Sequence, residues 1–363
     1  MLDKNAKLVL EDGTEFSGFS FGHEQGSSGE VVFNTGMVGY PETFTDPSYK
    51  GQILALTYPL IGNYGVPDGS VDQGMRRYFE SDRIHISGLI ISDYSRVHNH
   101  WNSARSLSEW LQENRIPAIC GIDTRALTKK LRHKGVMLGK VVFDDDIELY
   151  DPNKDNLVEK VSCKNPEIFD CDKKKSIGKT VILIDCGCKY NIIRSLLARG
   201  LKVIRVPWDH DIHSSGYAYD GVFISNGPGD PRMCEKTVET IKKEMERKDG
   251  KPVFGICLGN QLLARAAGAK TFKLKFGHRS QNQPCIEVGT KRCYITSQNH
   301  GFAVDDKSLP SGWRPWFTNA NDGTNEGIMH KSGRWCSVQF HPEATPGPKD
   351  TDFLFERFVE MIR

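Results

Sequence analysis

Lys251-Pro252-Val253-Phe254-Gly255-Ile256-Cys257-Leu258-Gly259 is the stretch that decides the fold of this chain. An apolar run ends where Cys257 stands between two glycines, and a segment rich in helix formers follows as far as Gly268. At a sharp strand-to-helix turn the backbone on both sides of the exposed residue approaches closely, so any Cβ there would clash. The stretch therefore predicts a strand, a nucleophile elbow and a helix. The alternative is that Cys257 is a small apolar residue on a glycine-rich turn.

In this arrangement Cys257 would stand at the N-terminus of the helix. The helix dipole and the free amide N–H groups at such an end favour a thiolate and stabilise a developing oxyanion. The elbow therefore predicts a reactive cysteine.

Length and charge narrow the class of protein. The chain has 363 residues, a formal net charge of +2 and 26% charged residues. This length favours two domains, and the charge gives no indication of a nucleic-acid or membrane surface. No apolar stretch approaches the about 20 residues that span a bilayer, and residues 1–4 lack the apolar core of a signal peptide. We therefore expect a cytoplasmic protein.

The ten cysteines lack the density and spacing of a secreted disulfide scaffold, so we interpret them as reduced thiols. Cys186-Gly187-Cys188 is the only pair that suggests a metal, and no second Cys/His pair with ligand spacing accompanies it. We expect no metal site.

We expect the chain to divide into a first domain of residues 1–150, a linker of residues 151–178 and a second domain of residues 179–363. In the first domain a hairpin at 7–16, further strands and a helix that begins after Ser106 predict an α+β fold. The linker is charged, polar and broken by proline.

In the second domain, strand-like runs alternate with helical stretches. The strands are expected at 181–184, 202–206, 221–224 and 252–255, and the helices at 191–198 and 235–246. This alternation predicts an α/β fold with a mostly parallel sheet. Reactive groups gather at the carboxyl ends of such strands, which is where Cys257 falls.

Gln339-Phe340-His341-Pro342-Glu343 follows the strand-like run 335–338 and supplies a candidate base with its orienting group. His341 would come off a strand end, and Glu343 could hold one imidazole nitrogen while the other faces the thiol. The alternative is a surface His-Pro-Glu turn.

Ser225-Asn226-Gly227-Pro228-Gly229-Asp230-Pro231 directly follows the strand at 221–224. Its glycines let backbone N–H groups point into a pocket, which suits an oxyanion hole completed by the amide of Leu258. As a lone motif it is an ordinary turn.

Together, Gly255–Gln261, Ser225–Pro231 and Gln339–Glu343 resemble the motifs of the class I (triad-type) glutamine amidotransferases. The resemblance implies a Rossmann-like α/β domain that hydrolyses glutamine to glutamate and ammonia through a γ-glutamyl thioester on Cys257. His341 would act as base and then as acid, with Glu343 orienting it. A primary amide has a poor leaving group, so this chemistry needs an activated thiolate, an oxyanion hole and a proton donor.

The first domain carries its own motifs. Residues 35–42, 45–49, 56–65 and 121–125 resemble the N-terminal domain of the carbamoyl phosphate synthetase small subunit, and with 297–302 the resemblance covers essentially the whole chain. It implies that ammonia passes through a protein channel to a synthetase, which makes carbamoyl phosphate from ammonia, bicarbonate and ATP.

Position within these motifs implies the residues that bind glutamine, namely Ser48, Gly227, Gly229, Leu258, Gln261, Asn299, Gly301 and Phe302. Ser48 would reach the site from the first domain. Asn260 departs from the family pattern, which commonly has His there. The ammonia-dependent, urea-cycle type of synthetase shares this Asn but has lost the cysteine. Because Cys257 is present here, we expect glutamine to be used, and the effect of Asn260 stays open.

Two other functions remain as alternatives: a non-catalytic module of an ammonia-dependent synthetase, and another triad amidotransferase or related hydrolase. No phosphate-binding loop is visible, so we expect no cofactor in this chain, with ATP and magnesium on the synthetase partner. That partner would be a large subunit or a fused synthetase domain. The pathway served (pyrimidine, arginine or urea) is not readable from the sequence.

Overall fold

The computed structural model describes residues 4–363, and the chain divides into two compact units. The first unit ends at Asp155 and the second runs from Asn156 to Arg363. Residues 1–3, part of the segment in which we found no signal-peptide pattern, lie outside the described residues.

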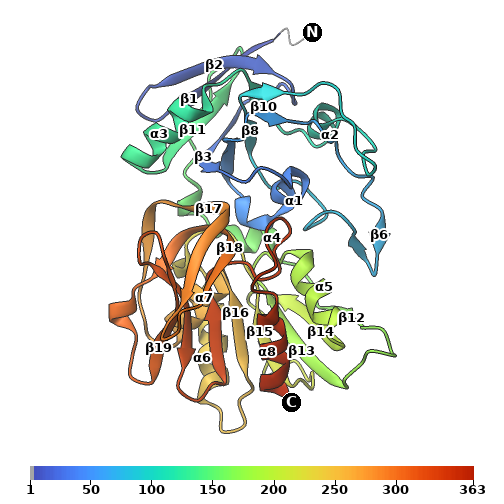
Figure 1. The fold of residues 1–363 in the computed structure, drawn as a ribbon, viewed down its shortest axis with the longest axis vertical. Helices are drawn as coiled ribbons and strands as arrows, with labels where there is room; N and C mark the ends of the chain where they lie inside the picture. The colour runs from blue at the N-terminus through green and yellow to red at the C-terminus, as the bar shows by residue number, and fades with distance from the viewer. Residues whose placement is uncertain (1–3) are drawn as a thin grey trace. The chain divides into compact units, whose positions relative to one another are not determined.

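Seven strands of the first unit close into a barrel in the order β1-β11-β3-β4-β8-β10-β2 (Figure 1). They are β1 (Asn5–Leu10), β2 (Glu15–Ser20), β3 (Ser27–Asn34), β4 (Gln52–Leu56), β8 (Gly88–Ile90), β10 (Ala118–Cys120) and β11 (Met137–Val142). The β3–β4, β4–β8 and β8–β10 pairs are parallel, and the other four pairs are antiparallel. Closure leaves the barrel without an open edge. The expected hairpin at 7–16 is β1–β2, but the closure was not predicted.

Three helices accompany the barrel: α1 (Tyr40–Thr45), α2 (Leu107–Glu113) and α3 (Thr124–Lys134). The predicted start of α2 is confirmed. The Ser106 hydroxyl accepts from the Glu109 N–H at 3.2 Å, and the Glu109 carboxylate accepts from the Ser106 N–H at 2.9 Å. This reciprocal capping box satisfies two N–H groups that a helix start otherwise leaves free.

Short elements complete the first unit. They are η1 (Pro47–Tyr49), β5 (Leu60–Ile61), β6 (Val71–Asp72), β7 (Met75–Arg76), β9 (Asp93–Tyr94) and η2 (Pro152–Lys154).

Trp110 on α2 stacks on Phe79 and Phe44, with ring centroids 5.4 and 6.2 Å away. This apolar cluster anchors the helix to the unit.

The second unit is built on a ten-stranded sheet in the order β12-β14-β13-β15-β16-β21-β20-β19-β17-β18. The strands are β12 (Glu167–Phe169), β13 (Lys179–Asp185), β14 (Leu201–Pro207), β15 (Gly221–Ile224), β16 (Val253–Ile256), β17 (Thr271–Glu287), β18 (Cys293–Val304), β19 (Trp313–Asn319), β20 (Asn325–His330) and β21 (Trp335–Val338).

The expectation of a mostly parallel sheet holds only for part of this sheet. The β14–β13, β13–β15, β15–β16 and β16–β21 pairs are parallel, whereas the other five pairs are antiparallel. Parallel neighbours need long crossovers, which α5 to α7 provide, while short turns join the strands of residues 271–338. The strand-like runs found in the sequence belong mostly to the parallel part of the sheet. The antiparallel strands between residues 271 and 330 were therefore not predicted.

Residues 151–178, which we expected to be a linker, contain regular structure. The helix α4 (Leu157–Val161) begins at Asn156, whose side chain accepts from the Glu159 N–H, and belongs to the second unit. Further on, β12 pairs with β14 at the edge of the sheet. Exposed short elements share the charged composition of linkers, so composition alone did not separate the two.

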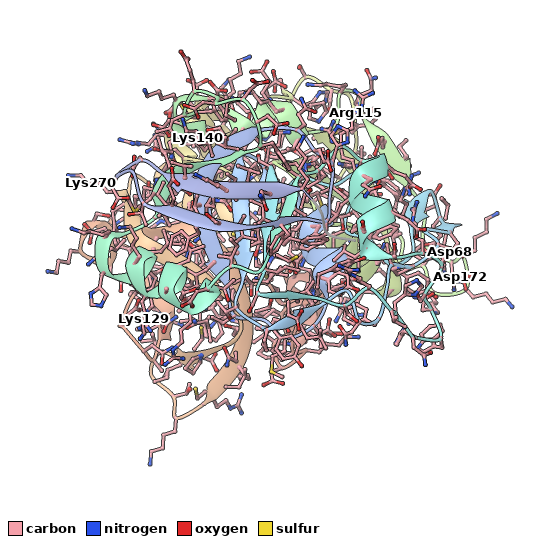
Figure 2. All side chains as sticks on the ribbon, turned by 90° about the horizontal axis from the view of Figure 1, so that it is seen from above. Asp68, Arg115, Lys129, Lys140, Asp172 and Lys270 are labelled. Atoms are coloured by element: carbon pink, nitrogen blue, oxygen red, sulfur yellow. The ribbon has the colours of Figure 1, made fainter. Side chains whose placement is uncertain are left out.

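The other helices of the second unit are α5 (Tyr190–Ala198), α6 (Glu235–Glu246), α7 (Leu258–Ala266) and α8 (Phe353–Ile362), with two short 3-10 turns, η3 (Pro231–Met233) and η4 (Asp306–Ser308). No helix within residues 4–363 has the length and apolarity to cross a membrane. Charged side chains of both signs, such as Lys129 and Asp172, point outward from the ribbon (Figure 2).

Candidate active site

The predicted elbow is present between β16 and α7. Cys257 has φ 56° and ψ −104°, a backbone conformation that is rare for residues other than glycine. A Cβ on Gly255 would lie 2.5 Å from the carbonyl oxygen of Gly259, and a Cβ on Gly259 would lie 2.4 Å from that of Ile224. Both glycines are therefore required by close backbone contacts, as the sequence predicted.

The Cys257 thiol is enclosed at the carboxyl end of the parallel strands, with 2% of the residue exposed. Its N–H donates to the carbonyl of Val338 at 2.8 Å, which ties the elbow to the end of the adjacent β21. Its Sγ lies 3.6 Å from the carbonyl oxygen of Asn299 on β18. Cys257 and Asn299 are far apart in the sequence, and both were predicted to belong to the site. In the structure they are neighbours.

His341 follows β21 and is fixed by both its backbone and its ring. Its N–H donates to the carbonyl of Ser297 at 2.9 Å, and its Nδ1 lies 2.6 Å from Oε1 of Glu343. Both side chains are buried. The other ring nitrogen, Nε2, is buried and has no hydrogen-bond partner among residues 4–363.

Charges decide the protonation of this pair. Burial lowers the pKa of His341, but the negative charge of Glu343 and the nearby Cys257 outweigh it and raise that pKa. Burial raises the pKa of Glu343, and the positive charges of Lys189 and His341 outweigh it and lower that pKa. The geometry therefore favours an ionised carboxylate beside an imidazole that readily takes up a proton.

Lys189 is a member of this site that the sequence analysis missed. It precedes α5, is 3% exposed, and places its Nζ 3.1 Å from Oε1 of Glu343. The same Nζ donates to the carbonyl of Ala344. The available signal was its position just after the carboxyl end of β13, where a lysine of a parallel sheet faces the same edge as Cys257.

The loop Ser225–Pro231 packs directly against the elbow. A Cβ on Gly227 would lie 2.0 Å from the carbonyl oxygen of Cys186 and 2.9 Å from the Leu258 side chain. The Asn226 side chain accepts from the Lys189 N–H at 3.0 Å. Gly229 has φ +86°. The loop thus joins the elbow and the Lys189 turn, as expected for residues that follow neighbouring strands.

Asn260 and Gln261 share one acceptor at the start of α7. Both amide groups donate to Oε1 of Gln339 at 3.1 Å, and the Ser337 hydroxyl donates to Oδ1 of Asn260 at 2.8 Å. Gln261 also donates to the carbonyl of Phe302 at 2.9 Å. Asn260 is fully buried, so it acts within the protein interior, where its acceptor Gln339 stands two residues before His341.

The structure gathers most of the predicted site residues in the second unit. The elbow contacts the Ser225–Pro231 loop and β18, which carries Asn299, Gly301 and Phe302. Ser48 lies in η1 of the first unit, where it is buried and its N–H donates to Oδ1 of Asp46 at 2.9 Å. The proposed approach of Ser48 to the glutamine site stays a prediction.

Two family models match the chain. Residues 182–361 match the class-I glutamine amidotransferase model, which agrees with the cysteine elbow and the His341–Glu343 pair. Residues 8–141 match the CPSase domain of the carbamoyl-phosphate synthase small chain. The chain therefore belongs to the carbamoyl-phosphate synthase small-chain family, with a class-I glutamine amidotransferase domain as its second part. The resemblance drawn from the sequence motifs is confirmed.

Curated relatives of about half identity match 99% of this chain. It is 52% identical over 376 residues to multifunctional protein pyr1-3 of Dictyostelium discoideum, covering 17% of that protein. It is 53% identical over 363 residues to multifunctional protein CAD of Squalus acanthias, covering 16%. The mitochondrial, ammonia-type carbamoyl-phosphate synthase of Homo sapiens is 48% identical over 363 residues, with 24% of it covered. The chain thus spans a quarter or less of each of these relatives.

Proposed function

We propose that this chain is the glutamine-hydrolysing part of a carbamoyl-phosphate synthase and supplies ammonia to a synthetase partner. The observation that carries the proposal is the Cys257 thiol on a strained elbow, beside a buried His341–Glu343 pair. That arrangement supplies a nucleophile, a base and an orienting carboxylate in one enclosed place.

The proposed reaction has two halves on Cys257. Its Sγ attacks the side-chain carbonyl carbon of glutamine, with His341 accepting the thiol proton. The new C–S bond forms, the C–N bond breaks, and His341 returns the proton to the leaving nitrogen, so that ammonia departs. Water, deprotonated by His341, then hydrolyses the thioester to glutamate and restores the thiol.

Backbone amides are proposed to stabilise the oxyanion in both halves. The N–H of Leu258 belongs to the first turn of α7, where helix amides have no partner within the helix. The Ser225–Pro231 loop, packed on the elbow, is the second candidate source of amides.

The remaining polar groups are proposed to bind glutamine itself. Gln261 uses its Nε2 within the protein, so it would offer Oε1 to the substrate. The other proposed contacts are Ser48, Gly227, Gly229, Leu258, Asn299, Gly301 and Phe302. A substrate with an α-amino group, a carboxylate and an amide requires such a mixed polar set.

We infer that the parallel half of the second unit forms a Rossmann-like core, with the elbow at its carboxyl edge. The first unit would act with the synthetase, which would bind ATP and magnesium. The curated names of the relatives, multifunctional proteins and carbamoyl-phosphate synthases, support a synthetase as a separate or fused partner. None of the ten cysteines, all of which lie within residues 4–363, is in a disulfide, which supports a reducing compartment such as the cytoplasm.

The alternative is a non-catalytic module of an ammonia-dependent synthetase, which the buried Asn260 favours because that position departs from the family pattern. Assay of the chain with its synthetase, using glutamine and ammonia separately, distinguishes the two. We expect carbamoyl phosphate from both nitrogen sources. Product from ammonia alone would establish the alternative.

A further inference from the structure

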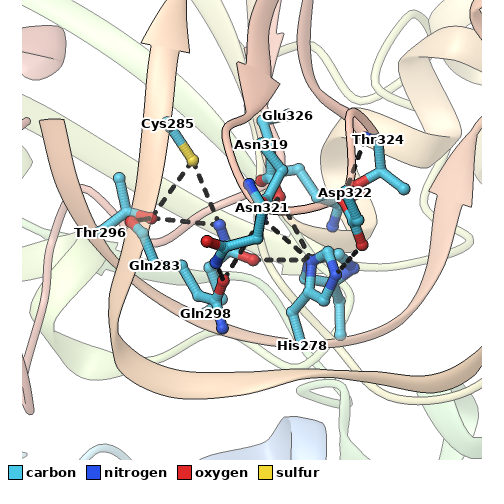
Figure 3. Close-up of polar contacts among 12 residues, drawn as sticks. His278, Gln283, Cys285, Thr296, Gln298, Asn319, Asn321, Asp322, Thr324 and Glu326 are labelled. Carbon is cyan, nitrogen blue, oxygen red and sulfur yellow. Dashed lines mark hydrogen bonds and ion pairs between the residues drawn. The ribbon is translucent and has the colours of Figure 1, made fainter. Parts of the chain in front are cut away.

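Three ligand-type side chains converge inside the second unit, and none of them has a part in the proposed reaction. His278 lies on β17, His300 on β18 and Glu326 on β20, and all three are buried. One ligand atom of each lies within 4.8 Å of those of the other two. Figure 3 shows His278 and Glu326 pointing toward one another. The geometry points to a divalent metal site, best suited to Zn²⁺, formed by His278, His300 and Glu326.

His278 is oriented by an outer partner in the way that zinc-binding histidines usually are. Its Nε2 donates to Oδ2 of Asp322 at 2.8 Å, a contact visible in Figure 3. In the neutral ring with its proton on Nε2, Nδ1 would carry the lone pair, and it lies 3.4 Å from Oε1 of Glu326. A carboxylate that fixes the tautomer and leaves the other nitrogen free for a metal is the typical second partner of such a ligand.

His300 contacts an acceptor oxygen with each ring nitrogen, and the shorter contact, to the backbone, favours the proton on Nδ1. Its Nδ1 donates to the carbonyl oxygen of Phe302 at 2.8 Å. Its Nε2 therefore carries a lone pair, yet this atom lies 3.1 Å from Oε1 of Gln298, which is itself an acceptor. The Gln298 amide nitrogen is used elsewhere, toward Cys285 and Thr296. A neutral ring carries one N–H, so it can donate to only one of these two oxygens, and its other nitrogen then faces an acceptor.

Glu326 adds a negatively charged carboxylate beside the acceptor nitrogens of His278 and His300. It is 0% exposed, and its Oε1 accepts from the Asn319 amide at 2.9 Å. Its Oε2 is buried and has no hydrogen-bond partner among residues 4–363. A buried carboxylate oxygen without a partner is costly, and a cation between these acceptors would satisfy it.

Two imidazole nitrogens and one carboxylate oxygen are a common zinc donor set, and Gln298 Oε1 offers a fourth atom. Zinc bonds of about 2.0–2.2 Å place tetrahedral ligands about 3.4 Å apart, so small side-chain shifts would close the site. The ion would cross-link β17, β18 and β20. Because His300 lies between Asn299 and Gly301, the bound ion would also stiffen β18, the strand proposed to hold glutamine.

The test uses the full chain without a histidine tag, in a Cys257→Ser background that removes the thiol of the proposed active site as a competing ligand. After chelator treatment and dialysis, Co²⁺ is titrated by visible absorption, Zn²⁺ is added in competition, and bound metal is counted by mass spectrometry. We expect about one ion per chain, tetrahedral Co²⁺ bands that Zn²⁺ abolishes, and a Tm about 5–10 °C higher when the site is saturated.

Two variants locate the ion and one serves as the control. Asp322→Asn, at a partly exposed outer partner, is expected to weaken binding about 10–100-fold, and Glu326→Gln to weaken it further. His213→Gln removes a histidine that also contacts a buried carboxylate, that of Glu244 at 2.9 Å, and should leave metal binding unchanged. Binding that survives both Asp322→Asn and Glu326→Gln, or folded protein that binds no metal and shows no change in Tm, would overturn the proposal. The acceptors would then share a proton instead.

Discussion

Nδ1 of His341 lies 2.6 Å from Oε1 of Glu343, and both side chains are buried. The contact fixes the proton on Nδ1, so Nε2 is the atom left to exchange a proton with Cys257. Lys189 contacts the same carboxylate oxygen at 3.1 Å. The carboxylate is thus held from two sides and cannot turn away from the ring.

Replacing Lys189 with methionine should destabilise the protein and slow glutamine hydrolysis. The change leaves the buried Glu343 with one partner fewer, and loss of one member of a buried ion pair costs about 3–5 kcal/mol. Urea unfolding and glutamate release measure the two effects. The matched control is Lys7→Met, whose ion pair with Glu15 at 2.9 Å is half exposed and should cost less than about 1 kcal/mol. Equal losses in the two variants would refute a structural role for Lys189.

The free energy of unfolding should depend on pH through the ionisation of His341 and Glu343. Despite burial, Lys189 and His341 lower the pKa of Glu343 from 4.5 to about 2, so its contribution is complete above pH 4.5 and is lost as the pH falls toward 2. Despite burial, Glu343 and Cys257 raise the pKa of His341 from 6.5 to about 10. Its contribution is therefore complete below pH 6.5 and is lost as the pH rises toward 10.

Glu343→Gln should flatten the profile in both pH windows, because it removes the acidic group and the main charge that supports the imidazolium. Urea midpoints measured from pH 3 to pH 10 for both proteins provide the comparison. If the two profiles run parallel over the whole range, the pair does not titrate as described.

Gly255→Ala tests the steric basis of the elbow. The new Cβ would lie 2.5 Å from the Gly259 carbonyl oxygen, so the backbone must shift. We expect a loss of at least about 1–3 kcal/mol in unfolding free energy, together with loss of glutamine hydrolysis as the thiol is displaced. Gly88→Ala is the control, because its Cβ would meet no atom closer than 3.5 Å. That variant should stay within about 1 kcal/mol of the parent.

Asn260→Ala tests whether the unusual residue beside the elbow supports His341. The change leaves the Ser337 hydroxyl without its acceptor and removes one donor from Gln339, which should cost about 1–3 kcal/mol. We also expect a lower kcat for glutamine, because Gln339 stands two residues before His341 on the same segment. Asn321→Ala, at an exposed amide that donates to Gln283 at 2.9 Å, should stay within about 0.5 kcal/mol. A stable Asn260→Ala protein with unchanged kcat would show that the network is dispensable.

Local sterics made part of this molecule predictable from its sequence. The bounds of α6 (Glu235–Glu246) and β21 (Trp335–Val338) match the predicted ranges, and the glycines beside Cys257 marked the elbow. Each of these features depends on neighbours a few residues away. Helix periodicity, strand runs and backbone clashes can all be recognised from residues a few positions apart in the sequence.

The other features of the fold and of the site were not predicted, because they depend on contacts between residues far apart in the sequence. Closure of the first-unit barrel and the antiparallel strands β17 to β20 depend on partners far along the chain. Lys189 meets Glu343 only because β13 and β21 end at the same edge of the sheet. The His278, His300 and Glu326 cluster likewise comes from three strands, with no ligand spacing for a motif search to find.

The most direct test of the proposed function is to trap the acyl-enzyme on Cys257. The chain is mixed with glutamine and quenched in acid within milliseconds to seconds, and the peptide that carries Cys257 is examined by mass spectrometry while glutamate release is followed in parallel. We predict one γ-glutamyl group on Cys257, and in Cys257→Ser neither the adduct nor glutamate release above background. Glutamate release by Cys257→Ser at the parent rate, with no adduct on the parent cysteine, would contradict the proposed thioester chemistry.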